Sequence, residues 1–92
     1  MKVIVRDEVY GDLDRIHAWI AKDRPAIADS VIDRILDSAE YLGWFPNMGH
    51  RGRVPGTHEW IVKGLPFIIV YEVYGERNEL IITAIFHGAQ DR

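Results

Sequence analysis

The sequence has 92 residues, of which 48% are hydrophobic and 27% charged, with a formal net charge of −3 at pH 7. This length predicts a single domain over residues 1–92, and the abundant aromatic and β-branched residues exclude a disordered chain. The absence of cysteine excludes disulfides and thiolate metal sites, and a pI near 5.7 argues against a protein that binds nucleic acid over its whole surface.

The chain begins with segments that predict a strand and a helix. Residues 3–5 form a short β-branched run, which is typical of a strand. Asp7 is a candidate N-cap for the helix, in which apolar residues recur at positions 9, 13, 16 and 20 and therefore share one face. The opposite face of this helix is mainly charged and carries Asp12, Asp14, Arg15 and Lys22.

A second helix is predicted from Pro25 to Gly43. Proline is favoured at the first position of a helix, where its missing N–H has no partner to lose, and glycine is a common C-terminal stop. The apolar stripe of this helix consists of Ala28, Val31, Ile32, Ile35, Ala39 and Leu42. Two amphipathic helices joined by so few residues predict an antiparallel helical hairpin.

The second half of the chain predicts the layer against which this hairpin packs. Residues 47–57 contain three glycines and predict a loop, and strand-like segments follow at 58–63, 67–74 and 79–87. Residues 67–71 are apolar on both faces, so we expect them in the centre of the sheet and the first strand at an edge. The predicted fold is α+β, a helical hairpin on one face of a small, mainly antiparallel sheet, in the order β-α-α-β-β-β.

Charge is distributed unevenly along the chain. Residues 7–40 have a net charge of −5, whereas residues 41–92 are neutral. Within the second half a local basic patch contains Arg51, Arg53 and Lys63 against the single acid Glu59. The sequence therefore predicts an acidic helical surface and a modest basic patch near the start of the sheet.

The first candidate site lies in this basic patch. Arg51 and Arg53 are two positions apart, so in an extended segment both point to one side and are suited to hold phosphate oxygens. His58 and Glu59 beside them are suited to acid–base chemistry on a phosphodiester. On the residues alone, the alternative that the arginines are a solvated loop and His58 an ordinary strand residue is favoured.

The second candidate is His87, which closes the last predicted strand before Gly88. A histidine at the rim of a sheet is suited to act as a general acid or to contact a ligand, and equally to hydrogen-bond a turn carbonyl. The four histidines, at 17, 50, 58 and 87, show no metal-ligand spacing, so we expect no metal, and no motif indicates a cofactor.

Several short motifs resemble, in their order and spacing, the RelE/ParE toxin superfamily of bacterial type II toxin–antitoxin modules, and its ParE-like branch in particular. They are residues 42–49 (LGWFPNMG), 52–59 (GRVPGTHE), 65–71 (LPFIIVY) and 86–90 (FHGAQ). The resemblance implies a growth-inhibiting toxin neutralised by a cognate antitoxin, whose C-terminal segment wraps the toxin. It also implies a cytoplasmic protein, in agreement with the absence of a long apolar run or a signal peptide.

The resemblance implies two possible activities. ParE-like toxins inhibit DNA gyrase without hydrolytic residues, whereas RelE-like toxins are ribosome-dependent endoribonucleases that promote 2′-OH attack in mRNA. Here His58 stands where the family usually has arginine, and residues 79–92 contain no lysine and only one arginine, Arg92. We therefore expect gyrase inhibition, with mRNA cleavage as the alternative. Whether the chain is an enzyme stays open, and so does a third alternative, an inactive toxin retained as a folded partner of its antitoxin.

The expected partners are the antitoxin and either DNA gyrase or, as the alternative, the ribosome with mRNA, without membrane association or sequence-specific DNA binding. If the chain is a ribonuclease, the expected catalytic residues are His58, His87 and Arg53. The residues expected to bind the target or a phosphate are Arg51, Arg53, His58, Glu59, Tyr71 and His87.

Overall fold

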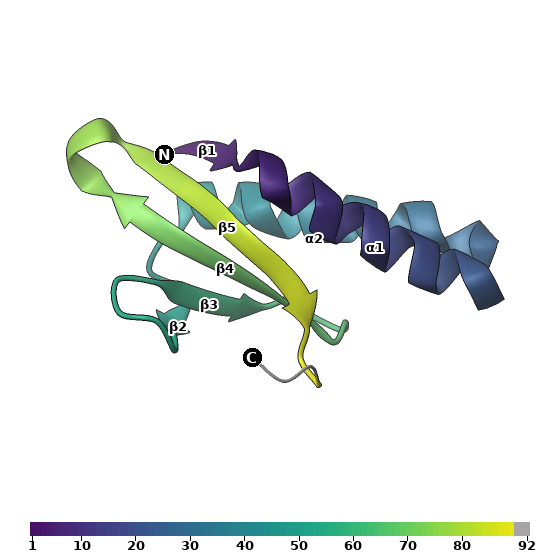
Figure 1. Cartoon of the computed structure of the whole chain (residues 1–92). Coiled ribbons are helices and arrows are strands. Elements are labelled where there is room, and N and C mark those ends of the chain that lie inside the picture. The colour runs from purple at the N-terminus through teal and green to yellow at the C-terminus, as the bar shows by residue number, and fades with distance from the viewer. Residues whose placement is uncertain (90–92) are drawn as a thin grey trace.

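The computed structural model describes residues 1–89, in which two helices lie on one side of a five-stranded sheet (Figure 1). The predicted α+β fold and its order of elements are confirmed. The elements are β1 (Lys2–Val5), α1 (Asp7–Asp23), α2 (Pro25–Trp44), β2 (His50–Arg51), β3 (His58–Ile61), β4 (Phe67–Tyr74), the short 3₁₀ helix η1 (Gly75–Arg77) and β5 (Glu79–His87).

The strands are arranged in the order β1-β5-β4-β3-β2. β4 lies in the middle and β1 at an edge, as predicted. β1 pairs in parallel with β5, in a register that places Lys2 beside Glu79 and Val5 beside Ile82, while the other neighbours are antiparallel. The first and last strands of the described residues, β1 and β5, are therefore neighbours in the sheet.

The core lies between the helical hairpin and the face of the sheet that the two helices cover. The predicted helix stripes are confirmed, with Ile20 and Ile32 only partly buried. A single contiguous cluster contains Val9, Leu13, Ile16, Val31, Ile35, Ala39, Leu42, Val62, Phe67, Ile69, Tyr71, Leu80, Ile82 and Ile85. Within residues 1–89, no buried side-chain nitrogen or oxygen lacks a hydrogen-bond partner.

Two predicted helix ends differ from the structure. Asp7 is the first helical residue rather than the N-cap, which is Arg6, and in the first turn its charge interacts favourably with the helix dipole. Gly43 lies inside the last turn of α2 rather than ending it. A Cβ at Gly43 would stand 2.6 Å from Val3 Cγ2 and 2.9 Å from the Met1 carbonyl oxygen, so this glycine permits close packing of β1 on the end of α2.

The predicted loop over residues 47–57 contains a strand that the sequence did not reveal. His50 and Arg51 form β2 and pair with Glu59 and His58 of β3. The flanking glycines make this possible, because a Cβ at Gly49 would stand 2.4 Å from the hydroxyl oxygen of Tyr71. β3 in turn ends at Ile61 rather than at the predicted residue 63, because the turn to β4 begins there.

Candidate functional site

The first part of the candidate site is the β2–β3 hairpin, residues 50–59, called here the basic hairpin. Its loop is closed by Thr57, which is buried. The carbonyl oxygen of Thr57 accepts a hydrogen bond from the Gly52 N–H at 2.8 Å, and the Thr57 hydroxyl donates to the Val54 carbonyl at 2.6 Å. Gly56 has a φ of 84°, a conformation that favours glycine. The loop is therefore held by its own backbone and hydroxyl contacts.

Glu59 fixes the basic hairpin from inside. Its side chain is 6% exposed, and its Oε2 accepts a hydrogen bond from the backbone N–H of Arg53 at 3.1 Å. Its Oε1 lies 3.9 Å from Nε2 of His50. This geometry supports a role for Glu59 in positioning the loop that carries Arg53.

The two arginines lie on either side of Gly52, at the end of β2. Both are exposed, and Arg51 stands beside His58 across the β2–β3 pair. Because β2 ends at Arg51, the alternation of side chains along an extended strand does not continue to Arg53. The extended segment on which a shared phosphate clamp was predicted is thus interrupted.

Tyr71 is an internal anchor of the same region. Its side chain is fully buried, its hydroxyl donates to the Pro46 carbonyl at 2.8 Å, and it accepts from the Gly49 N–H at 2.9 Å. Burial raises the pKa of Tyr71, and the hydrogen bond from Gly49 opposes this shift. The ring stacks on His58, with centroids 5.2 Å apart. Its position supports a role in holding His58 and the chain before β2.

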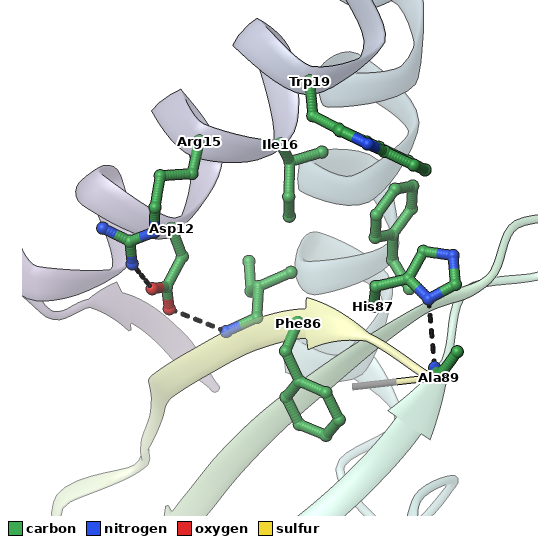
Figure 2. A pocket seen from close by; sticks show the side chains of 9 residues that line it. Asp12, Arg15, Ile16, Trp19, Phe86, His87 and Ala89 are labelled. Atoms are coloured by element: carbon green, nitrogen blue, oxygen red, sulfur yellow. Dashed lines mark hydrogen bonds and ion pairs between the residues drawn. The ribbon is translucent and has the colours of Figure 1, made fainter. Parts of the chain in front are cut away.

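The second part of the candidate site is a pocket of about 530 Å³ between α1 and the end of β5, called here the α1–β5 pocket (Figure 2). The His87 ring stands edge-on to Trp19 and to Phe67, with centroids 5.6 Å apart in both pairs. Its Nδ1 accepts a hydrogen bond from the Ala89 N–H at 3.0 Å. The pocket is lined by Asp12, Arg15, Ile16, Trp19, Phe67, Ile85, Phe86, His87 and Ala89.

Asp12 joins the helix to the sheet at this pocket. Its Oδ2 accepts a hydrogen bond from the backbone N–H of Ile85 at 3.0 Å, and its Oδ1 pairs with Arg15 (Figure 2). The prediction that Asp12 lies on the solvent face of α1 is wrong. The pairing of β1 with β5 ends at Ile82, and further along β5 the Asp12 carboxylate, rather than a strand, accepts the hydrogen bond from the Ile85 N–H.

The structure does not bring His58 and His87 together. His58 pairs with Tyr71 and His87 with Phe67, at positions four residues apart along β4 and on opposite sides of it. At about 3.3 Å per residue this separation is about 13 Å along the strand alone. The predicted site therefore divides into the basic hairpin and the α1–β5 pocket. Gln90 and Arg92 lie outside the described residues.

A family model described as "ParE toxin of type II toxin-antitoxin system, parDE" matches residues 3–92. The chain belongs to this ParE toxin family. It is 33% identical over 78 residues to "Putative toxin Y4kP" of Sinorhizobium fredii, which covers 85% of this chain and 78% of that protein. It is 28% identical over 82 residues to Toxin RelE3 of Caulobacter vibrioides, which covers 88% and 87% of the two chains.

Two solved structures share the fold of this ParE family member. The "Chromosomal ParDE TA system from P. aeruginosa" superposes with a TM-score of 0.84 over 95% of each chain, at 22% identity. The isolated E. coli RelE toxin superposes with a TM-score of 0.65 over 98% of this chain and 86% of that one, at 10% identity. The predicted membership of the RelE/ParE superfamily is confirmed. No helix within residues 1–89 is long and apolar enough to cross a membrane.

Proposed function

We propose that this chain, the toxin component of a type II toxin–antitoxin module, arrests growth by inhibiting DNA gyrase and is held inactive by a cognate antitoxin. The observation that carries the choice of gyrase is the separation of His58 from His87. An acid and a base that cleave one phosphodiester must both reach the same few atoms, within hydrogen-bond distance or through one water. A strand separation of about 13 Å argues against that pairing.

The charge of the surface gives a second argument for a protein target. Arg6, Arg15 and Arg77 are in contact with the carboxylates of Glu72, Asp12 and Glu79. Paired arginines contribute little to phosphate neutralisation, on which nucleic-acid affinity depends. Together with the net charge of −3, this favours a protein surface as the target.

The antitoxin is supported by the family and by exposed apolar side chains. The superposed P. aeruginosa structure is that of a ParDE toxin–antitoxin system. On this chain Trp44 is 80% exposed, Trp19 59% and Ile61 56%. Large exposed aromatic and aliphatic side chains are typical of surfaces that a partner protein covers.

A supercoiling assay tests the gyrase proposal. Purified chain at a stoichiometric excess over gyrase should inhibit supercoiling of relaxed plasmid, and addition of the antitoxin should restore it. Arg51→Ala tests whether the basic hairpin contributes to the inhibition, with Arg24→Ala at the junction of the two helices as the matched exposed control. Unchanged supercoiling at all ratios, in a preparation that arrests growth when expressed, would contradict gyrase as the target.

The alternative is a RelE-like ribosome-dependent endoribonuclease. It is favoured by the position of Arg51 beside His58 on neighbouring strands and by the similarity to Toxin RelE3. This alternative predicts cuts in translated mRNA at the ribosomal A site that are lost in His58→Ala and in His87→Ala. His17→Ala, which removes a histidine that pairs with Asp29 between the helices, is the control. Intact mRNA during growth arrest would exclude it.

A further inference from the structure

Several large apolar side chains gather where α2 ends and the chain passes to β2 at the edge of the sheet (Figure 1). Trp44 is 80% exposed, Phe45 53% and Tyr41 43%. The Tyr41 ring lies 5.0 Å from the Phe45 ring and 6.5 Å from the Trp60 ring of β3, measured between centroids. Met48, in the segment between α2 and β2, is also exposed. These five side chains are called here the aromatic patch.

The aromatic patch is separate from the core of the domain. The buried stripe of α2, which ends with Ala39 and Leu42, faces the sheet, whereas Trp44 and Phe45 project into solvent. A monomeric protein rarely exposes several large apolar side chains side by side, and such a patch usually marks an interaction surface. Tryptophan, tyrosine, phenylalanine and methionine are also the residue types enriched at the centres of protein interfaces. The composition of the patch therefore indicates a protein partner.

One border of the aromatic patch is acidic. Asp37 lies four positions before Tyr41 on α2, so the two side chains are neighbours on the helix surface. Glu40 has the same relation to Trp44. Both carboxylates are exposed, and within residues 1–89 neither takes part in an ion pair. This border therefore offers two carboxylates to the cations of a partner.

The opposite border, along the sheet edge, is basic. Trp60 and His58 project from the same side of β3, because side chains alternate along a strand. Arg51 stands across from His58 on β2, is exposed, and forms no ion pair with any residue that the structure describes. Further along the same edge the Arg34 guanidinium reaches from α2 and donates to the Lys63 carbonyl at 2.6 Å. This border therefore offers cations to the carboxylates of a partner.

The order of these groups makes the surface complementary to itself. From α2 to the sheet edge it passes from carboxylates through aromatic rings to guanidinium groups. A two-fold axis through the aromatic patch places the acidic border of one copy against the basic border of the other, at two equivalent positions, and brings the rings together at the centre. A nucleic acid strand or an anionic lipid surface would instead be repelled by the acidic border. A second copy of the chain fits both borders at once.

From this order of charges and rings we infer that two copies of the free chain associate through the aromatic patch. In this two-fold dimer Asp37 and Glu40 of one copy face Arg51 of the other. The inference goes beyond the proposed function and depends neither on the target nor on the antitoxin. The dimer covers Arg51, so the basic hairpin is fully accessible only in the monomer.

The mass of the purified chain, measured by sedimentation equilibrium over a range of concentrations, tests the inference. The wild type should pass from the mass of one copy to that of two as the concentration rises. Trp44→Ala should weaken the association at least about tenfold, because a tryptophan at the centre of an interface is typically one of its strongest contributors. Trp19→Ala removes an exposed tryptophan of α1 outside the patch and should leave the association unchanged.

An exchange of charges tests the two-fold arrangement. Glu40→Arg places cations against cations at both borders, and Arg51→Glu places acids against acids, so each variant alone should associate at least about tenfold more weakly. An equimolar mixture of the two variants should restore the dimer, because every facing pair then has opposite charges. Asp23→Arg, at the other end of the helical hairpin, is the matched control and should dimerise as the wild type does.

The far-UV circular dichroism of every variant should match that of the wild type, since all the substituted side chains are exposed. A wild type that stays monomeric at every concentration would overturn the inference. A dimer that persists unchanged in Trp44→Ala and Glu40→Arg would also overturn it, because the dimer would then use another face. Failure of the mixed variants to associate, with both folded, would contradict the pairing of the acidic border with the basic one.

Discussion

The basic hairpin and the α1–β5 pocket are built in opposite ways. The basic hairpin consists of ten consecutive residues, and its charged side chains project from a loop held by Thr57 and Glu59, while Tyr71 of β4 holds the chain before β2. The α1–β5 pocket combines a helix and a strand, and the bond from the Ile85 N–H to Asp12 joins residues 73 positions apart. The first is a local structure with internal anchors, whereas the second exists only when the whole fold is formed. We therefore expect substitutions to affect them separately.

The largest effect is expected for Gly49→Ala. A new Cβ would lie 2.4 Å from the Tyr71 hydroxyl oxygen and 2.9 Å from the Glu59 carbonyl oxygen, and neither can move freely. The free energy of unfolding should fall by about 3 kcal/mol, as in other overpacked sites. Urea denaturation measures this, and Gly75→Ala, where nothing lies within 4 Å of the new Cβ, is the control. Shifts of the pocket resonances in Gly49→Ala would show that the two regions are coupled.

Tyr71→Phe should lower the free energy of unfolding somewhat less than Gly49→Ala does. It leaves the Pro46 carbonyl and the Gly49 N–H without the hydroxyl that now satisfies both, and such loss typically costs about 2 kcal/mol. Tyr74→Phe, at an exposed position, should change the free energy of unfolding by less than about 0.5 kcal/mol. Hydrogen exchange at Gly49 should accelerate in Tyr71→Phe alone. Equal stability of the two variants would contradict the anchoring role of Tyr71.

Asp12→Ala tests the other region. Loss of the charge-assisted hydrogen bond to the Ile85 N–H should lower the free energy of unfolding by about 1.5 kcal/mol. The exchange of the Ile85 amide should become faster, while the basic hairpin keeps its exchange rates. Asp14→Ala, at an exposed position of the same helix, is the control. An unchanged Ile85 amide would mean that Asp12 does not hold this edge of β5.

The smallest effect is a loss of stability at high pH. Burial raises the pKa of Tyr71, so the unfolded chain releases this proton near pH 10 while the folded chain retains it. The stabilisation is fully present below pH 10 and declines as the pH rises through the raised pKa. The hydrogen bond to Glu72 raises the pKa of Tyr74 in wild type and Tyr71→Phe alike. Between pH 8 and 11 the free energy of unfolding should therefore fall more steeply with pH in the wild type than in Tyr71→Phe. Parallel curves for the two proteins would contradict a raised pKa of Tyr71.

The elements that the sequence predicted well are those with a strong local period. The apolar spacings of α1 and α2 are recovered as the buried stripes, and the boundaries of β4 and β5 match the predicted ranges. β2 was not predicted, because a strand of two residues between glycines is too short to show a periodic pattern of apolar residues. Its pairing depends on how closely Gly49 and Gly52 approach Tyr71 and Thr57.

The candidate site was predictable only in part. The local motif around Arg51 and His58 could be found because its members are neighbours in sequence. Nothing in sequence distinguishes a half-buried Asp12, whose hydrogen bond reaches Ile85, from the exposed acids beside it. Glu59 and Tyr71 were expected as contact residues. The central placement of residues 67–71 already indicated a buried Tyr71, whereas the burial of Glu59 becomes visible only in the folded structure. Their predicted contact with a target stays a prediction.

The parallel pairing of β1 with β5 has a consequence for synthesis. Lys2 pairs with Glu79, so β1 cannot pair with its neighbour in the sheet until β5 has emerged from the ribosome. Until then β4 also lacks β5, its most extensive neighbour, and the α1–β5 pocket has no floor. Contacts of such long sequence separation form late in folding. We therefore expect a nascent or truncated chain that stops before β5 to form neither the α1–β5 pocket nor the strand pairs of β1.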